Sequence, residues 1–311
     1  MSTKRILVTG GGGFVAGSVI AQSGPDTELH AVSRGNGLTE RPGVCWHSTS
    51  LDDLTGWEAL FDAVRPDAVI HTAAIADIDY CQANPTDCRR VNVEFTRQLA
   101  RLCAAFETRL VFCSTDTIFD GEHAPYCEID PPDPVNIYAE SKVDAEKAVV
   151  ATTPRHVIAR IGLVLGLPVL GTGNSFVAKL LVTLRTGRSV AVPANEIRTP
   201  VDVITLGRAL LELATGSFAG VIHLAGNDRV SRLEINRGIA ARFGFPADLV
   251  QPGSSATTAG RARRPRDVSL DNTLARAELR TPMLNFDSAL ELALGSVPIT
   301  ESSRVATDQS Q

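Results

Sequence analysis

A tyrosine and a lysine stand four residues apart in a segment of helical character. Tyr138 and Lys142 lie within 137–150, and their spacing puts both side chains on one face of a helix. An ammonium beside a phenol favours tyrosinate, so the pKa of Tyr138 is expected to fall below its usual value of about 10. The pair is then predicted to act as a general acid that protonates a carbonyl oxygen while hydride reaches the carbon. A solvent-exposed pair on a helix surface is the alternative.

Two hydroxyl residues stand at the end of a predicted strand. Ser114 and Thr115 close the apolar segment that begins at residue 109. In open α/β sheets, ligands bind at the carboxyl ends of the strands. A hydroxyl group at this place is therefore expected to donate a hydrogen bond to the same carbonyl oxygen.

A run of glycines connects the first predicted strand to the first predicted helix. Gly10 and Gly13 fit the pattern TGxxGxxG, with Ala16 in the third place. Glycine lets backbone N–H groups approach a pyrophosphate, and the N-terminus of the following helix adds partial positive charge. We therefore predict that Gly10, Gly13 and the next residues, Phe14 and Val15, bind a dinucleotide cofactor. A merely flexible loop is the alternative.

The end of the second predicted strand indicates which dinucleotide is bound. Ser33 and Arg34 stand where an acidic residue would contact the ribose 2′-hydroxyl of NAD. A guanidinium pairs with the 2′-phosphate of NADP, which a carboxylate would repel. NADP(H) is therefore preferred, with NAD(H) possible if Arg34 is only a solvated surface residue. Asp52 or Asp53, after the next strand, is placed to reach the adenine, and a helix cap is the alternative.

Apolar β-branched segments alternate with amphipathic ones along most of the chain. Strands that are apolar throughout indicate a parallel sheet with helices on both faces. The expected strands are 5–9, 28–33, 68–71, 109–114, 156–161 and 220–224. The expected helices are 14–22, 57–64, 86–106, 137–150, 176–185, 203–215 and 231–243. The predicted fold class is α/β, a Rossmann-type doubly wound parallel sheet with a smaller C-terminal substrate-binding lobe.

The alternation changes after about residue 165, which suggests two lobes. We expect an NAD(P)-binding Rossmann domain at 1–165, to which 200–225 returns, and a substrate-binding lobe at 166–295. The polar segment 296–311 is expected to be a flexible tail.

The bulk composition restricts the possible partners. A net charge of −5 argues against nucleic acid or an anionic membrane as the main partner. The chain shows no signal-peptide pattern and no bilayer-spanning apolar run, so the cytoplasm is expected. Six cysteines without a CxxC are interpreted as structural thiols, and six scattered histidines argue against a metal site.

Several motifs together resemble the extended short-chain dehydrogenase/reductase family: Thr9–Gly13, Asn92 in 91–93, Ser114–Thr115–Asp116 and Tyr138xxxLys142. Within that family, further segments are similar to the dTDP-4-dehydrorhamnose reductases: 114–121, 134–138, 173–176 and 264–271. The resemblance spans residues 4 to about 294.

This resemblance implies reduction of the 4-keto group of a nucleotide-linked deoxysugar by NADPH. It places the catalytic roles on Thr115, Tyr138 and Lys142. It implies that Ala73, Ala74 and Asn92 bind the cofactor in addition to the residues named above. Tyr138 and Lys142 are expected to contact the cofactor as well. It assigns the sugar nucleotide to Thr115, Asp116, Asn174, Phe176 and Arg266. A homodimer is possible, since dimers are common in the family.

Three positions depart from the subfamily and suggest a different sugar or a reshaped pocket. Thr117 and Leu163 replace aromatic residues, and Arg198 stands in a segment that usually has glycine. A sugar-nucleotide epimerase or another extended short-chain reductase therefore stays open. So does a non-catalytic NADP-binding regulatory subunit, resembling the β subunit of methionine adenosyltransferase. The basic run at 261–266 is either a clamp on the substrate diphosphate or a solvated turn.

Overall fold

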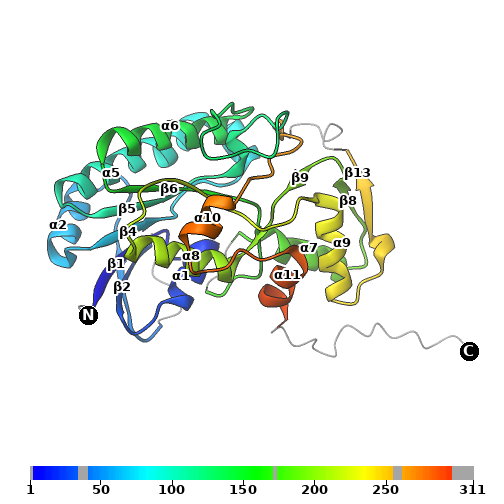
Figure 1. Cartoon of the computed structure of the whole chain (residues 1–311), viewed down its shortest axis with the longest axis horizontal. Coiled ribbons are helices and arrows are strands. Elements are labelled where there is room, and N and C mark those ends of the chain that lie inside the picture. Colours follow the sequence, from blue (N-terminus) through cyan, green and yellow to red (C-terminus); the bar gives the residue numbers. More distant parts are fainter. Residues whose placement is uncertain (1–2, 34–40, 171–173, 255–260, 296–311) are drawn as a thin grey trace, which may run out of the picture.

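A seven-stranded parallel sheet forms the centre of the molecule (Figure 1). The computed structural model describes residues 3–33, 41–170, 174–254 and 261–295. The strands follow the spatial order β11-β6-β5-β4-β1-β2-β3, so the direction of winding reverses between β1 and β4. Their bounds are β1 Lys4–Thr9, β2 Thr27–Ser33, β3 Val44–Ser48, β4 Ala68–His71, β5 Arg109–Cys113, β6 His156–Ile161 and β11 Gly220–Leu224. The predicted doubly wound fold is confirmed.

Helices cover both faces of this sheet, as strands without a polar face require. Ile6 and Val8 pack into one core and Leu7, between them, into the other. The first core is covered by α1 (Phe14–Gln22), α8 (Val203–Thr215) and α10 (Thr273–Glu278). The second is covered by α2 (Leu54–Val64), α5 (Phe95–Ala105) and α6 (Ile137–Thr152).

The single long helix predicted at 86–106 is divided in the structure. It consists of α4 (Pro85–Arg89), a π-helical turn (Arg90–Glu94) and α5, and a separate helix α3 (Ile78–Ala83) precedes it. Proline occupies the first position of α4 because it fixes a helical φ and needs no N–H partner there. The π turn interrupts the regular hydrogen bonding and places Asn92 in the interior, with 1% of its surface exposed. The prediction of one regular helix was therefore wrong.

A smaller lobe with its own apolar core follows β6. Its helices are α7 (Phe176–Arg185), α9 (Arg232–Arg242) and α11 (Phe286–Leu294). Short two-stranded pairings join β8 (Val190–Pro193) to β13 (Val250–Gly253), β9 (Ile197–Arg198) to β12 (Val230–Ser231), and β7 (Val164–Leu165) to β10 (Val201–Asp202).

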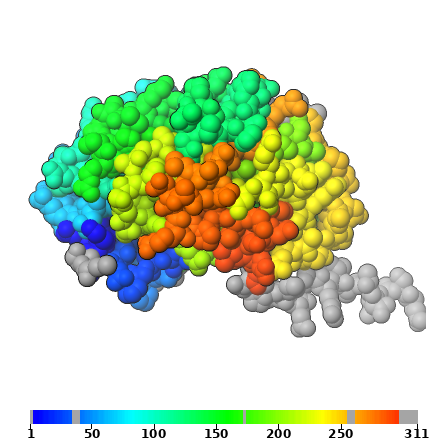
Figure 2. Space-filling model, viewed as in Figure 1, coloured from blue at the N-terminus to red at the C-terminus, as the bar shows by residue number. Residues whose placement is uncertain are grey.

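The chain leaves this lobe to add the last strand to the sheet. β11 pairs in parallel with β6, with Val221 opposite Ile158, so the predicted return of 220–224 to the sheet is confirmed. Figure 2 shows the segment after residue 260 packed across the middle of one face, beside both parts of the molecule. The exact lobe boundaries, 1–165 and 166–295, stay a prediction.

Within the described ranges, no helix combines the length and apolar character needed to cross a membrane. In the same ranges, His, Cys, Asp and Glu side chains do not gather in groups of three or more that would hold a metal ion. All six cysteines are free thiols.

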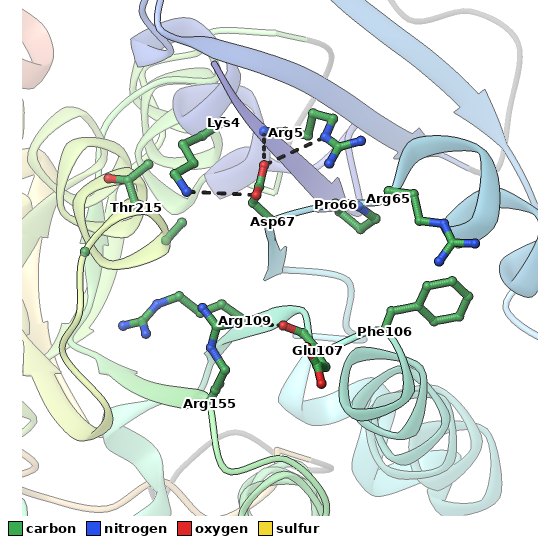
Figure 3. A pocket seen from close by; sticks show the side chains of 12 residues that line it. Lys4, Arg5, Arg65, Pro66, Asp67, Phe106, Glu107, Arg109, Arg155 and Thr215 are labelled. Atoms are coloured by element: carbon green, nitrogen blue, oxygen red, sulfur yellow. Dashed lines mark hydrogen bonds and ion pairs between the residues drawn. The ribbon is translucent and has the colours of Figure 1, made fainter. Parts of the chain in front are cut away.

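A basic cavity of about 320 Å³ lies at the amino ends of the strands (Figure 3). Its charged lining residues are Lys4, Arg5, Arg65, Arg109 and Arg155, with Asp67 and Glu107. Two of the arginines bind carbonyl groups at the ends of helices. Arg5 donates to the Val64 carbonyl of α2 at 3.0 Å, and Arg109 donates through Nε to the Leu213 carbonyl of α8 at 2.7 Å. These cations therefore compensate the negative C-terminal ends of the helices, which is a structural role.

Replacing Arg109 by methionine is expected to lower the free energy of unfolding by roughly 2 kcal/mol, because the charged donors satisfy carbonyl groups in the interior. Arg109 is only 5% exposed and also donates to the Phe218 carbonyl. Urea denaturation measures the loss. Arg155 lines the same cavity, but its hydrogen bond to the Glu107 carbonyl, at 2.8 Å, is exposed to solvent. Arg155→Met is therefore the control, with an expected change below about 0.5 kcal/mol. Equal losses in the two variants would contradict a specific role for Arg109.

Candidate active site

Helix α6 presents three functional groups on one face toward the sheet. Tyr138, Lys142 and Glu146 follow one another at intervals of four residues, and all three are buried. Asn136 caps the helix by accepting a hydrogen bond from the Ala139 N–H at 3.0 Å. The exposed fractions of Tyr138 and Lys142 are 9% and 3%, so the alternative of a solvent-exposed pair is excluded.

The ammonium of Lys142 is held at the carboxyl end of β5. Its Nζ donates to the Cys113 carbonyl at 2.6 Å and lies 4.1 Å from the centroid of the Phe112 ring. Burial lowers the pKa of Lys142 to about 8. This position places the amine beside the strand end at which ligands bind in open α/β sheets.

The phenol of Tyr138 has a higher pKa than the sequence predicted. Burial raises the pKa of Tyr138 above its ordinary value, and the charge of Asp116 adds to this. A hydrogen bond with Thr115 acts in the opposite direction. The expectation that the pKa of Tyr138 falls below its usual value is therefore wrong for this arrangement, because removal from water is the largest effect on the phenol. Tyr138 keeps its proton at neutral pH.

The two hydroxyl residues after β5 have different surroundings. Ser114 donates to the Glu146 carboxylate at 2.5 Å, and that carboxylate also pairs with Arg160 at 3.0 Å. The Ser114 hydroxyl therefore has a structural role. Thr115 caps a short 3₁₀ helix and exchanges a hydrogen bond with the Thr117 hydroxyl at 3.0 Å. Of the two, Thr115 contacts the phenol.

The glycine turn is built by close backbone approach. Gly10 has a φ of +70°, and a Cβ added there would lie 2.9 Å from the Ala73 Cα. A side chain at Gly13 would lie 2.9 Å from the Gly10 carbonyl oxygen. The turn therefore requires glycine at both positions, and it brings Ala73 next to the start of α1.

The N-terminus of α1 lacks a side-chain cap. Its N-cap is Gly13, and no side chain accepts a hydrogen bond from its first N–H groups. Among the other helices of nine or more residues in the described chain, only α5, which continues directly from the π turn, also lacks a side-chain cap. Side chains cap the rest: Asp53 for α2, Asn136 for α6, Ser175 for α7, Asp202 for α8, Ser231 for α9 and Asn285 for α11. The uncapped N–H groups of α1 fit the phosphate oxygens of a dinucleotide.

Asn92 connects the cofactor side of the site to α6. Its side-chain oxygen accepts from the Ile75 N–H at 2.8 Å, and its amide donates to the Ile75 carbonyl at 3.1 Å and the Ser141 hydroxyl at 3.0 Å. The segment that contains Ala73 and Ala74 is thereby held between the glycine turn and α6.

Asp116 is a buried carboxylate with one unsatisfied oxygen. It is 4% exposed, Thr115 donates to its Oδ1 at 3.2 Å, and Oδ2 has no hydrogen-bond partner among the described residues. Burial raises the pKa of Asp116 to about 6, against the opposing charge of Arg198. A carboxylate in this state is available to accept from a substrate hydroxyl.

The other predicted site residues are more dispersed. The Phe176 ring lies 4.6 Å from the guanidinium carbon of Arg232, and Asn174 and Arg266 are exposed. Asp52 forms an ion pair with Arg90 at 2.7 Å, while its neighbour Asp53 caps α2. Ser33 ends β2, and Arg34 lies outside the described residues.

Three further residues join the site and were absent from the sequence prediction: Glu146, Arg160 and Arg232. Glu146 follows Lys142 by four residues, so its helical spacing was a usable signal. Arg160 and Arg232 reach the site only through the tertiary fold, and no local pattern marks them.

Comparisons with known proteins agree with this fold. The pattern of the RmlD substrate binding domain family matches residues 4–298. A dTDP-4-dehydrorhamnose reductase of Mycobacterium tuberculosis is 31% identical over 301 residues, covering 94% of this chain and 93% of that protein. The methionine adenosyltransferase 2 subunit beta of Pongo abelii is 29% identical over 274 residues, covering 86% and 80%.

A solved structure gives a close match in fold. The dTDP-4-dehydrorhamnose reductase of Bacillus anthracis, in complex with NADP, superposes with a TM-score of 0.84 at 21% identity and covers 96% of this chain and all of that one. The fold and the matching motifs define an NAD(P)-dependent oxidoreductase of the extended short-chain dehydrogenase/reductase type. More specifically, the chain belongs to the RmlD substrate binding domain family.

Replacing Asp116 by asparagine is expected to stabilise the protein at pH 8 by about 1–3 kcal/mol. The pKa of Asp116 rises from 3.8 to about 6 in the folded state, so its protonated form is favoured by folding. That contribution is present below the unfolded pKa and is lost as the pH rises through about 6. The gain from Asp116→Asn should therefore be smaller at pH 5 than at pH 8. Urea denaturation at both pH values measures it, and a gain that is independent of pH would refute this account.

Proposed function

We propose that this protein reduces the 4-keto group of a nucleotide-linked deoxysugar with NADPH, in the manner of a dTDP-4-dehydrorhamnose reductase. The single observation that carries the proposal is the placement of Tyr138 and Lys142. Both are buried on one face of α6 and lie against the carboxyl end of β5, beside Thr115. The likeness to the Mycobacterium tuberculosis reductase over nearly the whole chain supports the substrate class.

The residues around the glycine turn fit the cofactor. The free N–H groups at the start of α1 suit a pyrophosphate, and Gly10, Gly13, Phe14 and Val15 form that turn. Ala73, Ala74 and Asn92 are proposed to contact the same cofactor, and Ser33 and Asp52 to lie on its adenosine side. Arg34, which lies outside the described residues, is proposed to pair with the 2′-phosphate. When bound, NADPH supplies the hydride. The presence of NADP in the Bacillus anthracis structure supports this preference.

In the proposed reaction, Tyr138 donates its proton to the developing alkoxide oxygen. Its raised pKa keeps it protonated until the carbonyl oxygen gains charge. Thr115 orients that oxygen by hydrogen bonding, and Lys142 contacts the cofactor side of the site. With a pKa of about 8, Lys142 carries its positive charge at neutral pH.

The substrate lobe at 166–295 is proposed to hold the sugar nucleotide through Asn174, Phe176 and Arg266, with Asp116 on the sugar. Six free thiols accord with a reducing compartment, so we place the protein in the cytoplasm. A homodimer is part of the same proposal, by analogy with the family.

Tyr138→Phe should lower kcat for NADPH oxidation with dTDP-4-dehydro-6-deoxy-L-mannose by about 10²–10⁴-fold, because the proton donor is lost. The dissociation constant for NADPH should stay within about threefold of the wild type, since the ring remains. Tyr80, an exposed tyrosine on α3, supplies the matched control Tyr80→Phe, with unchanged kcat. Full activity in Tyr138→Phe would exclude the proposed role. An epimerase would instead interconvert sugar isomers without net NADPH oxidation.

Arg34→Ala should raise the KM for NADPH by roughly tenfold or more, because a charge-assisted pair with the 2′-phosphate is lost. The KM for NADH, which lacks that phosphate, should stay the same and serves as the internal control. Steady-state kinetics with both cofactors measures the two values. A parallel rise in both would show that Arg34 does not recognise the phosphate.

A second candidate function is a non-catalytic, NADP-binding regulatory subunit. The 29% identity to the methionine adenosyltransferase 2 subunit beta favours it. The retained Tyr138 and Lys142 favour the enzyme. An absence of NADPH oxidation across a panel of 4-keto sugar nucleotides, with intact NADPH binding, would support the regulatory function.

A further inference from the structure

Arg232 lies beside the candidate site without a hydrogen-bond acceptor for its guanidinium among the described residues. It is the first residue of α9, and its backbone N–H donates to the Glu196 carbonyl at 2.8 Å. The side chain stacks on Phe176, with 4.6 Å between the guanidinium carbon and the ring centroid. Burial lowers the pKa of Arg232 to about 10. A partly buried guanidinium has five N–H donors to satisfy, so this arrangement is unfavourable by itself.

The surroundings of Arg232 increase this unfavourable energy. Arg198 and Arg261 lie near it, and both pair with Glu196, at 3.7 and 3.3 Å. Glu196 is therefore shared by two guanidiniums before Arg232 is considered. The N-terminus of a helix also disfavours a cation. A negatively charged ligand would satisfy the N–H donors of Arg232 and offset both the neighbouring guanidiniums and the positive end of the helix.

The carboxylate of Asp116 is close enough to Arg232 to act on its charge. Its charge raises the pKa of Arg232, but no ion pair within 4.0 Å joins the two groups in the described structure. Asp116 keeps an oxygen without a partner. An unsatisfied acceptor and an unsatisfied cationic donor thus stand near each other without pairing. A sugar phosphate has both complementary groups, since its hydroxyls donate to a carboxylate and its phosphate oxygens accept from a guanidinium.

We propose that Arg232 binds the diphosphate of the sugar-nucleotide substrate and is a specificity-determining residue of this chain. Phe176 holds the plane of the guanidinium by stacking, which leaves its N–H edge free to bind two phosphate oxygens. The inference rests on the proposed function and deepens it. Arg232 is thereby added to the expected diphosphate clamp, in which Arg266 was the predicted residue. The side chain of Arg266 is exposed, and its backbone carbonyl already accepts hydrogen bonds from Ile197 and Arg198.

Binding measurements with the NADP-loaded protein test this proposal without requiring turnover. Isothermal titration with dTDP and with inorganic pyrophosphate should show that Arg232→Gln raises both dissociation constants by about tenfold or more. Arg232→Lys keeps the positive charge but loses the planar guanidinium. Its affinity for each ligand should therefore lie between that of the wild type and that of Arg232→Gln. The dissociation constant for NADP should be unchanged in both variants, and the melting temperature should not fall in either, because Arg232 is unfavourably placed without a ligand.

Arg185→Gln is the matched control, because Arg185 is an exposed arginine in the last turn of α7, the helix that begins with Phe176. It should bind both ligands as the wild type does. An equal loss in Arg185→Gln would assign the effect to net charge and overturn the proposal. Unchanged affinity for dTDP and pyrophosphate in Arg232→Gln would also overturn it. This holds even if Arg232→Gln binds a sugar nucleotide with a carboxylate on the sugar less tightly, because Arg232 would then bind the sugar and not the diphosphate.

The outcomes separate this inference from the proposed reaction. If Arg232→Gln loses dTDP affinity while the wild type reduces no keto sugar, Arg232 binds a nucleoside diphosphate and the reductase function fails. If the wild type reduces the keto sugar and Arg232→Gln binds dTDP normally, the reductase function stands and the role of Arg232 fails. A wild-type protein that binds neither dTDP nor pyrophosphate excludes the role of Arg232.

Discussion

The geometry of the site depends on the contacts of the buried Glu146 carboxylate. It accepts from Ser114 at the end of β5 and pairs with Arg160 on β6, and both residues of the ion pair are almost fully buried. A buried charge is tolerated only with good partners, so few other placements of α6 are available. Because Lys142 and Tyr138 lie one and two turns earlier on that helix, this contact also fixes their height above the sheet.

The amino and carboxyl ends of the parallel strands carry different polar groups. At the amino edge, basic side chains satisfy the helix C-termini. At the carboxyl edge, a chain of hydrogen bonds runs from the Ala73 N–H to Thr9, His71, Thr96 and the Asn92 carbonyl. Because Thr96 donates to that carbonyl, it accepts from Nε2 of His71, which sets the tautomer. Burial lowers the pKa of His71 to about 3, so the ring stays neutral and rigidly connects the cofactor turn to the helix of Asn92.

Sequence patterns predicted the layers of this fold and the helix that carries Tyr138 and Lys142. They failed where contacts between distant segments determine the structure. Apolar runs located the buried strands, and α7 and α8 have the predicted bounds. β3 has a mixture of exposed and half-buried residues, as an edge strand does, and therefore a weaker signal. The π turn at 90–94 was missed because its helical periodicity resembles that of an ordinary helix. Arg232 and Arg160 come from segments far from Tyr138, and only the folded chain brings them near it.

The pKa of Tyr138 shows most clearly why spacing alone was insufficient. A separation of four residues establishes that Tyr138 and Lys142 share a helix face, but the sign of the pKa shift depends on water and on other partners. In the folded protein the ammonium is bound by the Cys113 carbonyl and the Phe112 ring, while the phenol is surrounded by apolar groups, thiols and Asp116. A neutral phenol is the form a proton donor needs. Among the described residues, the same exclusion of water leaves Asp116 and Arg232 with unsatisfied polar groups. This unfavourable energy is concentrated where a polar ligand would relieve it.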